Sequence, residues 1–465
     1  MKTQRRDGLH EPIRRRLPRF ALLLFALSLL PVSPSPHLPV AFTTGAERVT
    51  TATREGRLAV FDEVWTTLRA RYYDPQLHGV DWPTQRTALR PLAAEADSPA
   101  AFYAVLRRML GSLRDAHTRV YSPEERSDWQ RTVYPSVGVS AREIAGEVIV
   151  TNVERNSEAW RAGVRAGDAV TSIDGEAVMQ KLARRLAEES SASTVQAARL
   201  QATVRLFDGP LDAPVSVTFT RGEGKRSRTV SLRRTLRTRE PALDFRREDG
   251  IAIARFNLFT QEIAVELLRM LEREEMQRAR GLVIDLRDNG GGETEAMTDI
   301  ASAFLPLGTN LGRFIDRDGN TTSAPQTRPA MLLTAAANIK NFPHPIVVLT
   351  GARTSSAAEI FAAALQAADR ADLIIGEPTC GCVLGIRRRH PLPDGGLLDI
   401  SEMDFRTARD TRLEGTGVTP DEQLAPSKQD IRAGHDPALK RATDFLRAKG
   451  KRQQVTVEES EPRDG

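Results

Sequence analysis

The sequence predicts an α/β fold for residues 240–425, a twisted sheet with flanking helices. Three apolar runs rich in β-branched residues have the length and composition of buried strands. They are Ile251–Phe256, Leu282–Leu286 and Ile346–Leu349. Two segments of helical character, Ile263–Arg278 and Ala357–Ala368, are interleaved with them. Because helices intervene as in βαβ units, we expect the three strands to be neighbours in one sheet.

The N-terminal residues 1–46 are expected to be a signal peptide or a membrane anchor with a linker. Residues 1–19 carry seven Lys or Arg and two Asp or Glu, and the apolar run Phe20–Leu30 follows them. A basic start before a short apolar core is typical of a secretory signal. Cleavage after Ala46 and retention as an anchor both stay open. We expect secretion across the inner membrane to a periplasmic or envelope-associated location.

Charge gives no reason to expect a nucleic-acid partner. The chain has 66 basic and 61 acidic residues, and subtracting those of residues 1–19 leaves 59 of each. The remainder is therefore neutral, without the positive field that nucleic-acid binding uses. With 465 residues, 40% of them hydrophobic, the chain can bury cores for two or three domains. Residues 426–465 become polar, and we expect Lys449–Gly465 to be disordered.

A pair of serines lies where a strand gives way to a helix. Gly351 ends the run Ile346–Leu349, and Ser355 and Ser356 precede the helix that starts at Ala357. The free N–H groups and positive dipole end of a helix N-terminus favour developing negative charge, which suits a nucleophilic hydroxyl. The same pattern is also that of an ordinary helix N-cap.

Three other segments carry residue types that a hydrolytic site uses. A strand ends in the Asn-Gly-Gly-Gly loop at 289–292, whose backbone N–H groups can approach a ligand closely. Asp115 and His117 stand one residue apart, and Glu414 begins the glycine-rich loop Leu413–Asp421. Each segment alone also has an ordinary structural interpretation, as a turn, a capping histidine or a loop.

Together and in this order, the four segments resemble the S41 family of serine peptidases, which comprises C-terminal processing proteases and tricorn-like relatives. The resemblance covers roughly Arg57 to Asp421. It implies a core related to the ClpP/crotonase fold at 240–425 and a helical N-terminal part of the protease at 55–130. It also implies a serine endopeptidase with protein or peptide substrates and with neither cofactor nor metal.

Residues 134–235 resemble a PDZ domain. Val137, Gly138 and Val139 look like its carboxylate-binding loop, which implies substrates with apolar C-termini. Val215–Thr220 and Thr229–Leu232 alternate apolar and polar residues, as a terminal hairpin does. The stretch Val178–Leu206 is longer than a small PDZ domain needs, and we interpret it as a helical insertion.

The catalytic residues implied by the resemblance depart from the family at one position. The processing proteases use a lysine as general base, and Cys382 stands in the matching place. The tricorn-like branch resembles a Ser-His arrangement, which assigns Ser356 as nucleophile and His117 as base. Ser355 is the alternative nucleophile, and Cys382 a less favoured one.

Three more residues complete the implied site. Glu414 would orient His117 directly or through a relay. The backbone N–H groups of Gly291 and Ala357 would stabilise the oxyanion. Two other function classes stay open: a catalytically inactive peptide-binding relative, and a small-ligand carrier on the same fold.

The chain contains two cysteines, Cys380 and Cys382. Their spacing does not suit a structural zinc site, which needs more ligands. In an oxidising envelope they could pair across a very short loop, and two separate thiols are the simpler interpretation.

Overall fold

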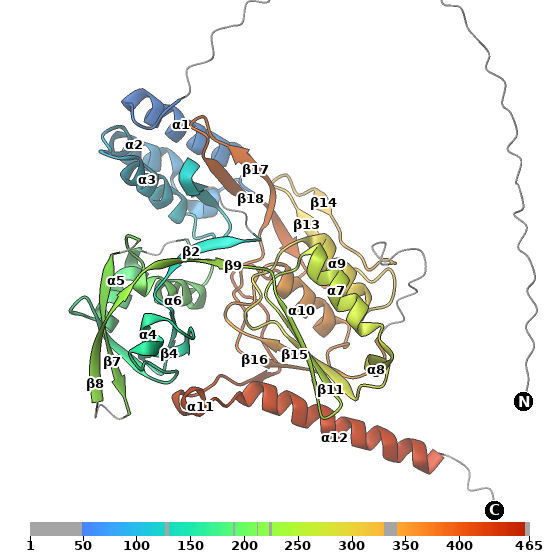
Figure 1. The fold of residues 1–465 in the computed structure, drawn as a ribbon. Helices are drawn as coiled ribbons and strands as arrows, with labels where there is room; N and C mark the ends of the chain where they lie inside the picture. Colours follow the sequence, from blue (N-terminus) through green and yellow to red (C-terminus); the bar gives the residue numbers. More distant parts are fainter. Residues whose placement is uncertain are drawn as a thin grey trace, which may run out of the picture. The chain divides into compact units, whose positions relative to one another are not determined.

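The computed structural model describes residues 49–125, 130–188, 191–211, 213–222, 226–329 and 342–460 (Figure 1). The expected signal peptide or anchor, residues 1–46, lies outside these ranges. Within them, no helix combines the length and apolar character that crossing a bilayer requires.

A six-stranded sheet forms the centre of the C-terminal half. Its order is β10-β11-β12-β15-β16-β19, with β10 antiparallel to β11 and the other neighbours parallel. The strands are β10 (Leu243–Glu248), β11 (Ile251–Phe256), β12 (Gly281–Asp285), β15 (Ile346–Thr350), β16 (Leu373–Gly376) and β19 (Glu422–Gln423). The three predicted strands are therefore neighbours, and the α/β fold class is confirmed.

Helices cover both faces of this sheet. Because successive residues of a strand point to opposite faces, Ala252 and Ala254 pack against one layer, and Ile251 and Ile253 against the other. The first layer contains α7 (Gln261–Leu271), α9 (Thr294–Ser302) and α10 (Ala357–Ala367). The helix expected over 263–278 ends at Leu271, and the single turn α8 (Glu274–Gln277) follows it.

The second layer corrects the expectation of a polar tail at 426–465. After α11 (Lys428–Ala433), the long helix α12 (Pro437–Ser460) runs along the sheet (Figure 1). Its residues Ala438, Ala442 and Leu446 are buried against β11, β12 and β15. Their spacing of four places them on one face of the helix. One face of residues 437–449 therefore belongs to the core, and the helix continues through most of the stretch expected to be disordered.

The N-terminal part is helical but shares its core with the catalytic half. It contains α1 (Arg54–Arg71), α2 (Trp82–Ala94) and α3 (Pro99–Gly111). Leu384, Leu398 and Ile400 are buried among the apolar side chains of these helices. Leu398 and Ile400 lie on β18 of a second sheet, and Leu384 directly precedes β17. In this sheet β18 pairs with β1, β13 and β17, and β13 with β14. The strands are β1 (Arg119–Tyr121), β13 (Arg313–Ile315), β14 (Thr321–Ser323), β17 (Gly385–Pro391) and β18 (Leu397–Arg406).

The β domain lies between β2 (Thr132–Ser136) and β9 (Thr235–Arg239), which pair as an antiparallel ribbon. Its sheet has the order β3-β4-β5-β7-β8, with β6 beside β5. The strands are β3 (Val139–Ile144), β4 (Glu147–Val153), β5 (Ala169–Ile173), β6 (Glu176–Ala177), β7 (Pro214–Arg221) and β8 (Arg226–Arg233). The predicted terminal hairpin is β7 and β8.

Three helices complete this domain: α4 (Glu158–Arg161), α5 (Val178–Glu188) and α6 (Val195–Val204). The stretch interpreted as an insertion is helical, as expected. Its residues Val178, Leu182, Ala202 and Leu206 are buried with the sheet in one core. Helices α5 and α6 are therefore integral to the β domain.

Candidate active site

Ser356 lies at the turn between β15 and α10 in a conformation that L-residues rarely adopt. Its φ is +56° and its ψ is −125°. Such a backbone costs about 1–3 kcal/mol and persists only where the surroundings hold it. The Ser356 N–H donates to the Cys382 carbonyl at 2.8 Å and to Glu359 Oε2 at 3.1 Å. Ser355 does not have this positive φ, so the strained backbone favours Ser356 as the nucleophile.

The glycine loop lies directly against Ser356. A Cβ placed on Gly291 would be 2.6 Å from the Cβ of Ser356 and 2.7 Å from the Ser355 carbonyl oxygen. Gly291 also has a φ of +88°. Its N–H donates to Asn289 Oδ1 at 2.9 Å, so this predicted oxyanion donor already has an acceptor. An asparagine side chain commonly accepts a hydrogen bond from the backbone two residues on, and Asn289 stands at that spacing from Gly291.

The second predicted oxyanion donor is free. Ala357 is the first residue of α10, and its N–H forms no hydrogen bond with any described residue. It is one of the N–H groups that a helix N-terminus leaves without an intrahelical partner. The positive end of the α10 dipole therefore lies at the turn that carries Ser356.

His117 stands on a loop that its neighbour Asp115 organises. Asp115 is fully buried and accepts from the His117 N–H at 2.8 Å and from the Thr118 hydroxyl at 2.5 Å. The imidazole Nδ1 is buried and has no partner among the described residues. Burial lowers the pKa of His117 to about 4, an effect that Asp115 opposes and Arg119 assists. The imidazole is thus neutral at neutral pH and can accept a proton.

The His117 loop and the Ser356 turn meet the same short segment. Ala116 is buried in a small cluster with Cys380 and Cys382. The Cys382 carbonyl in turn accepts the hydrogen bond from Ser356. The structure thus brings the two predicted catalytic segments to the loop Cys380–Val383, across 238 intervening residues.

Glu359, three residues after Ser356, is a fully buried carboxylate. Besides Ser356, it accepts from the Thr379 hydroxyl at 2.5 Å, the Gly381 N–H at 2.7 Å and the Cys382 N–H at 3.0 Å. Burial raises its pKa to about 7, against the lowering effect of these donors. The carboxylate ties the nucleophile turn to the loop. Its signal in the sequence is Ser356 followed by Glu three residues later, the pattern of a capping box.

Glu414, the predicted third member, does not contact His117 directly in the described structure. Its Oε2 accepts from the Val383 N–H at 2.6 Å, and its carboxylate accepts from the Ser193 hydroxyl. Burial raises the pKa of Glu414 to about 7, and the charges of Asp115 and Glu359 add to the rise. The charged groups that act on the His117 imidazole are Asp115 and Arg119.

Cys380 and Cys382 form a disulfide, so the simpler interpretation of two separate thiols is wrong. Their Cα atoms are 5.2 Å apart, and Gly381 turns the chain between them with a φ of +68°. Cys382 has no free thiol in this state, which contradicts its alternative role as nucleophile.

No lysine whose side chain the structure describes is available to replace it as a base. The four lysines whose side chains the structure describes pair elsewhere: Lys181 with Asp174, Lys428 with Glu147, Lys440 with Asp444 and Lys449 with Asp372.

The predicted peptide-binding loop of the β domain is partly occupied by its own contacts. Val137 and Val139 are buried in the domain core. Gly138 has a φ of +75°, and its N–H donates to Ser136 Oγ at 2.9 Å. Strand β3 pairs with β4 alone among the described strands, and helix α6 packs along it. An edge strand beside a helix is the arrangement that accepts an added peptide strand.

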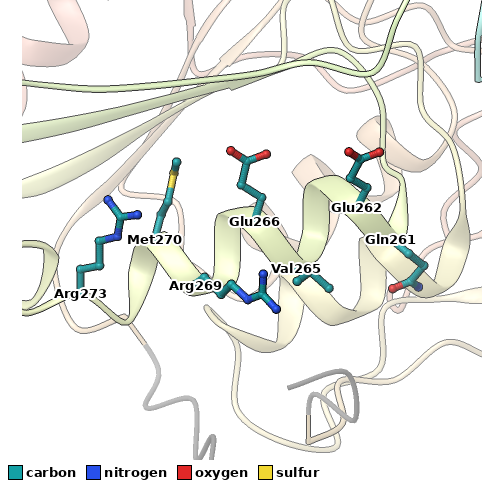
Figure 2. A pocket seen from close by; sticks show the side chains of 7 residues that line it. All are labelled: Gln261, Glu262, Val265, Glu266, Arg269, Met270 and Arg273. Atoms are coloured by element: carbon teal, nitrogen blue, oxygen red, sulfur yellow. The ribbon is translucent and has the colours of Figure 1, made fainter. Parts of the chain in front are cut away.

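A surface hollow of about 610 Å³ lies on α7 in the catalytic half. Figure 2 shows its lining, where Val265 and Met270 lie among Glu262, Glu266 and Arg269. None of the predicted site residues lines it. Within the described ranges, no group of three His, Cys, Asp or Glu side chains could hold a metal ion.

Profiles of three known domains match parts of the chain. The profile of peptidase family S41 matches residues 250–424, the tricorn protease C1 domain matches 54–111, and a PDZ domain matches 149–195. The S41 segment contains Ser356, Gly291 and Glu414. His117 follows the tricorn C1 segment.

Relatives extend the likeness over most of the chain. The carboxyl-terminal-processing peptidase 1 of Arabidopsis thaliana chloroplasts is 26% identical over 398 residues, which cover 82% of this chain and 74% of that protein. The C-terminal processing peptidase of Tetradesmus obliquus chloroplasts is 28% identical over 393 residues, covering 79% and 77%.

Among solved structures, mature CPAF has a TM-score of 0.63 at 14% identity, over 88% of this chain and 98% of that one. The photosystem II D1 C-terminal processing protease has a TM-score of 0.52 at 24% identity, over 82% and 98%. These two likenesses show the fold. Residues 250–424 form a domain of peptidase family S41, a family of serine-type hydrolases, and the chain also carries a PDZ domain.

Proposed function

We propose that this chain is a serine endopeptidase of the cell envelope that works with a Ser-His site. The observation that carries the proposal is the strained backbone of Ser356, which precedes the free N–H of Ala357. The Ser356 turn and the loop of the neutral His117 both meet the segment Cys380–Val383. Strained residues of this kind cluster at active sites. The disulfide Cys380–Cys382 supports an oxidising compartment outside the cytoplasm.

The chemistry follows from these positions. Ser356 Oγ attacks the scissile carbonyl carbon, and the hydroxyl proton passes to the neutral imidazole of His117. The Ala357 N–H donates to the oxyanion of the tetrahedral intermediate. Collapse of the intermediate breaks the C–N bond, and His117 returns the proton to the leaving amine. Water then hydrolyses the acyl-enzyme by the same steps. Gly291 serves this site by having no side chain.

The PDZ domain gives a proposal for substrate choice. The open edge of β3 beside α6 would receive an extended C-terminal segment, with apolar side chains entering the groove. We therefore propose protein or peptide substrates with apolar C-termini, captured by the domain before cleavage.

A second candidate is a peptide-binding protein without catalytic activity. The observation that favours it is the missing lysine, because Cys382 occupies the position of the family's usual base and is closed in a disulfide. A small-ligand carrier on the same fold is a third class.

The test is labelling of purified protein with a fluorophosphonate, followed by mass spectrometry of the tryptic peptides. The proposal predicts a single adduct on Ser356 that is absent from Ser356→Ala and present in Ser355→Ala. Wild-type protein that stays unlabelled while binding C-terminal peptides would support the inactive class instead.

A further inference from the structure

The β domain places one of its hydroxyl groups inside the buried polar network of the candidate active site. Ser193 stands just before α6, far in sequence from both groups that it contacts. Its Oγ accepts from the Ala116 N–H at 3.4 Å, and its hydroxyl donates to the Glu414 carboxylate. The hydroxyl therefore joins the loop of His117 to Glu414, which do not otherwise touch in the described structure.

We propose that Ser193 is a positioning residue for the catalytic base: it links Glu414 to the Asp115–His117 loop, so that the β domain completes the site. The inference rests on the proposed Ser-His function. A hydroxyl suits the position because it can accept from one neighbour and donate to another at the same time.

Several contacts hold Ser193 in this position. Thr194 caps α6, since its Oγ1 accepts from the Ala197 N–H at 3.1 Å, and it donates to the Cys380 carbonyl at 2.8 Å. Gln196 Nε2 donates to the Pro378 carbonyl at 3.2 Å. Ala192 and Ala197 are buried in the same cluster as Ala116 and the two cysteines. The start of α6 is thereby fixed on the loop that also holds Ser356.

An ion pair anchors the two parts further along the same segment. Arg142 Nη2, on β3, lies 2.7 Å from both carboxylate oxygens of Glu377. Both side chains are mostly buried, with exposed fractions of 28% and 22%. A buried charge pair of this kind fixes geometry more than it adds stability. Ser193 therefore meets the catalytic half on a defined surface.

Removing the hydroxyl has a consequence that a purely structural residue would not produce. The bond from Ser193 lowers the pKa of Glu414 against burial, and the groups facing this carboxylate are Asp115, Glu359, Tyr72 and Tyr73. None of these four groups is a cation, so none can stabilise the charged carboxylate in place of the lost hydrogen bond. In Ser193→Ala the pKa of Glu414 should rise further, and the acid limb of activity should move to higher pH.

The experiment compares the fluorophosphonate labelling rate of wild type, Ser193→Ala, Ser193→Thr and the control Ser231→Ala across pH. Ser231 is an exposed serine on β8 of the same domain. We expect Ser193→Ala to label about 10- to 100-fold more slowly, with its acid limb at higher pH. Ser193→Thr should restore most of the rate, and Ser231→Ala should match wild type. An unchanged acid limb in Ser193→Ala would overturn the proposal, whatever happens to the rate.

A double-mutant cycle on thermal stability tests the same hydrogen bond without an activity measurement. Tm is measured for Ser193→Ala, Glu414→Gln and the double variant, at a pH where Glu414 is ionised. Non-additive shifts support the interaction, and additive shifts overturn it. Failure of the proposed function is distinct, because wild type would then not label at all while the cycle still reports on the bond.

Discussion

Replacing Gly291 with alanine should disable the nucleophile while leaving the protein folded. A Cβ at this position would lie 2.6 Å from Ser356 Cβ and 2.7 Å from the Ser355 carbonyl oxygen. The loop and the serine turn must separate by about 0.8 Å to reach ordinary van der Waals contact. The φ of +88° adds a backbone cost of about 1–2 kcal/mol for an L-residue.

The kinetic effect should exceed the effect on stability. A displacement near 1 Å of a reacting group costs about a hundredfold in rate, so Gly291→Ala should label with fluorophosphonate about a hundredfold more slowly. Overpacking and the positive φ together should cost about 2–5 kcal/mol, which lowers Tm by several degrees.

The adjacent glycine provides a matched control. A Cβ at Gly290 would meet only Leu258 Cδ2, at 3.8 Å, and its φ lies outside the left-handed region. Gly290→Ala should therefore label at close to the wild-type rate. If Gly291→Ala labels as fast as Gly290→Ala, the close packing of this loop against Ser356 does not matter for reactivity, and our reasoning is refuted.

Three further predictions concern the buried carboxyl, the disulfide and the PDZ loop. The pKa of Glu414 is raised to about 7, so the stability that its protonated form contributes is present below about pH 4.5 and is lost as pH rises through 7. Glu414→Gln should therefore raise Tm relative to wild type at pH 8 and not at pH 4. An equal effect on Tm at both pH values would contradict the assignment. Replacing Cys380 and Cys382 by serine removes the closure of a three-residue loop and should lower the free energy of unfolding by about 1.6 kcal/mol. The labelling rate should fall less than about tenfold, because the hydrogen bonds of the loop remain. A loss of labelling as large as that of Ser356→Ala would mean that the disulfide itself is essential. Gly138→Ala should weaken binding of a fluorescent peptide with an apolar C-terminus, measured by polarisation, because the new Cβ would lie 2.6 Å from the Cβ of Ser157. The control Gly146→Ala has a similar positive φ, but its new Cβ would have nothing within 4 Å. Equal affinities of the two variants would mean that the peptide binds elsewhere.

The parallel sheet could be predicted because its central strands are short, mainly apolar runs that contain several β-branched residues. Burial on both faces leaves such runs few polar positions, and the intervening helices dictate parallel order. The serine turn and the glycine loop were also accessible, since both follow directly from strand ends in one sheet. Their approach in space is a consequence of β12 and β15 being neighbours.

Other features depend on contacts that local patterns do not carry. Helix α12 was not predicted because its composition is mostly polar and its apolar face is narrow. The four-residue spacing of that face could have been recognised in the sequence, at Ala438, Ala442 and Leu446. The contact of Ser193 with Glu414 joins residues from two domains, and no periodicity reports such a pairing. The engaged N–H of Gly291 follows from the side chain of Asn289, a local signal that could have been found.

The central claim is that His117, and no lysine, activates Ser356. Its most direct measurement is kcat for a peptide substrate in wild type, Ser356→Ala and His117→Ala, with folding verified by Tm. Members of a catalytic unit fail together, so we predict that both variants fall to the same background rate. A His117→Ala variant that keeps most of the wild-type kcat, while Ser356→Ala is inactive, would contradict the account.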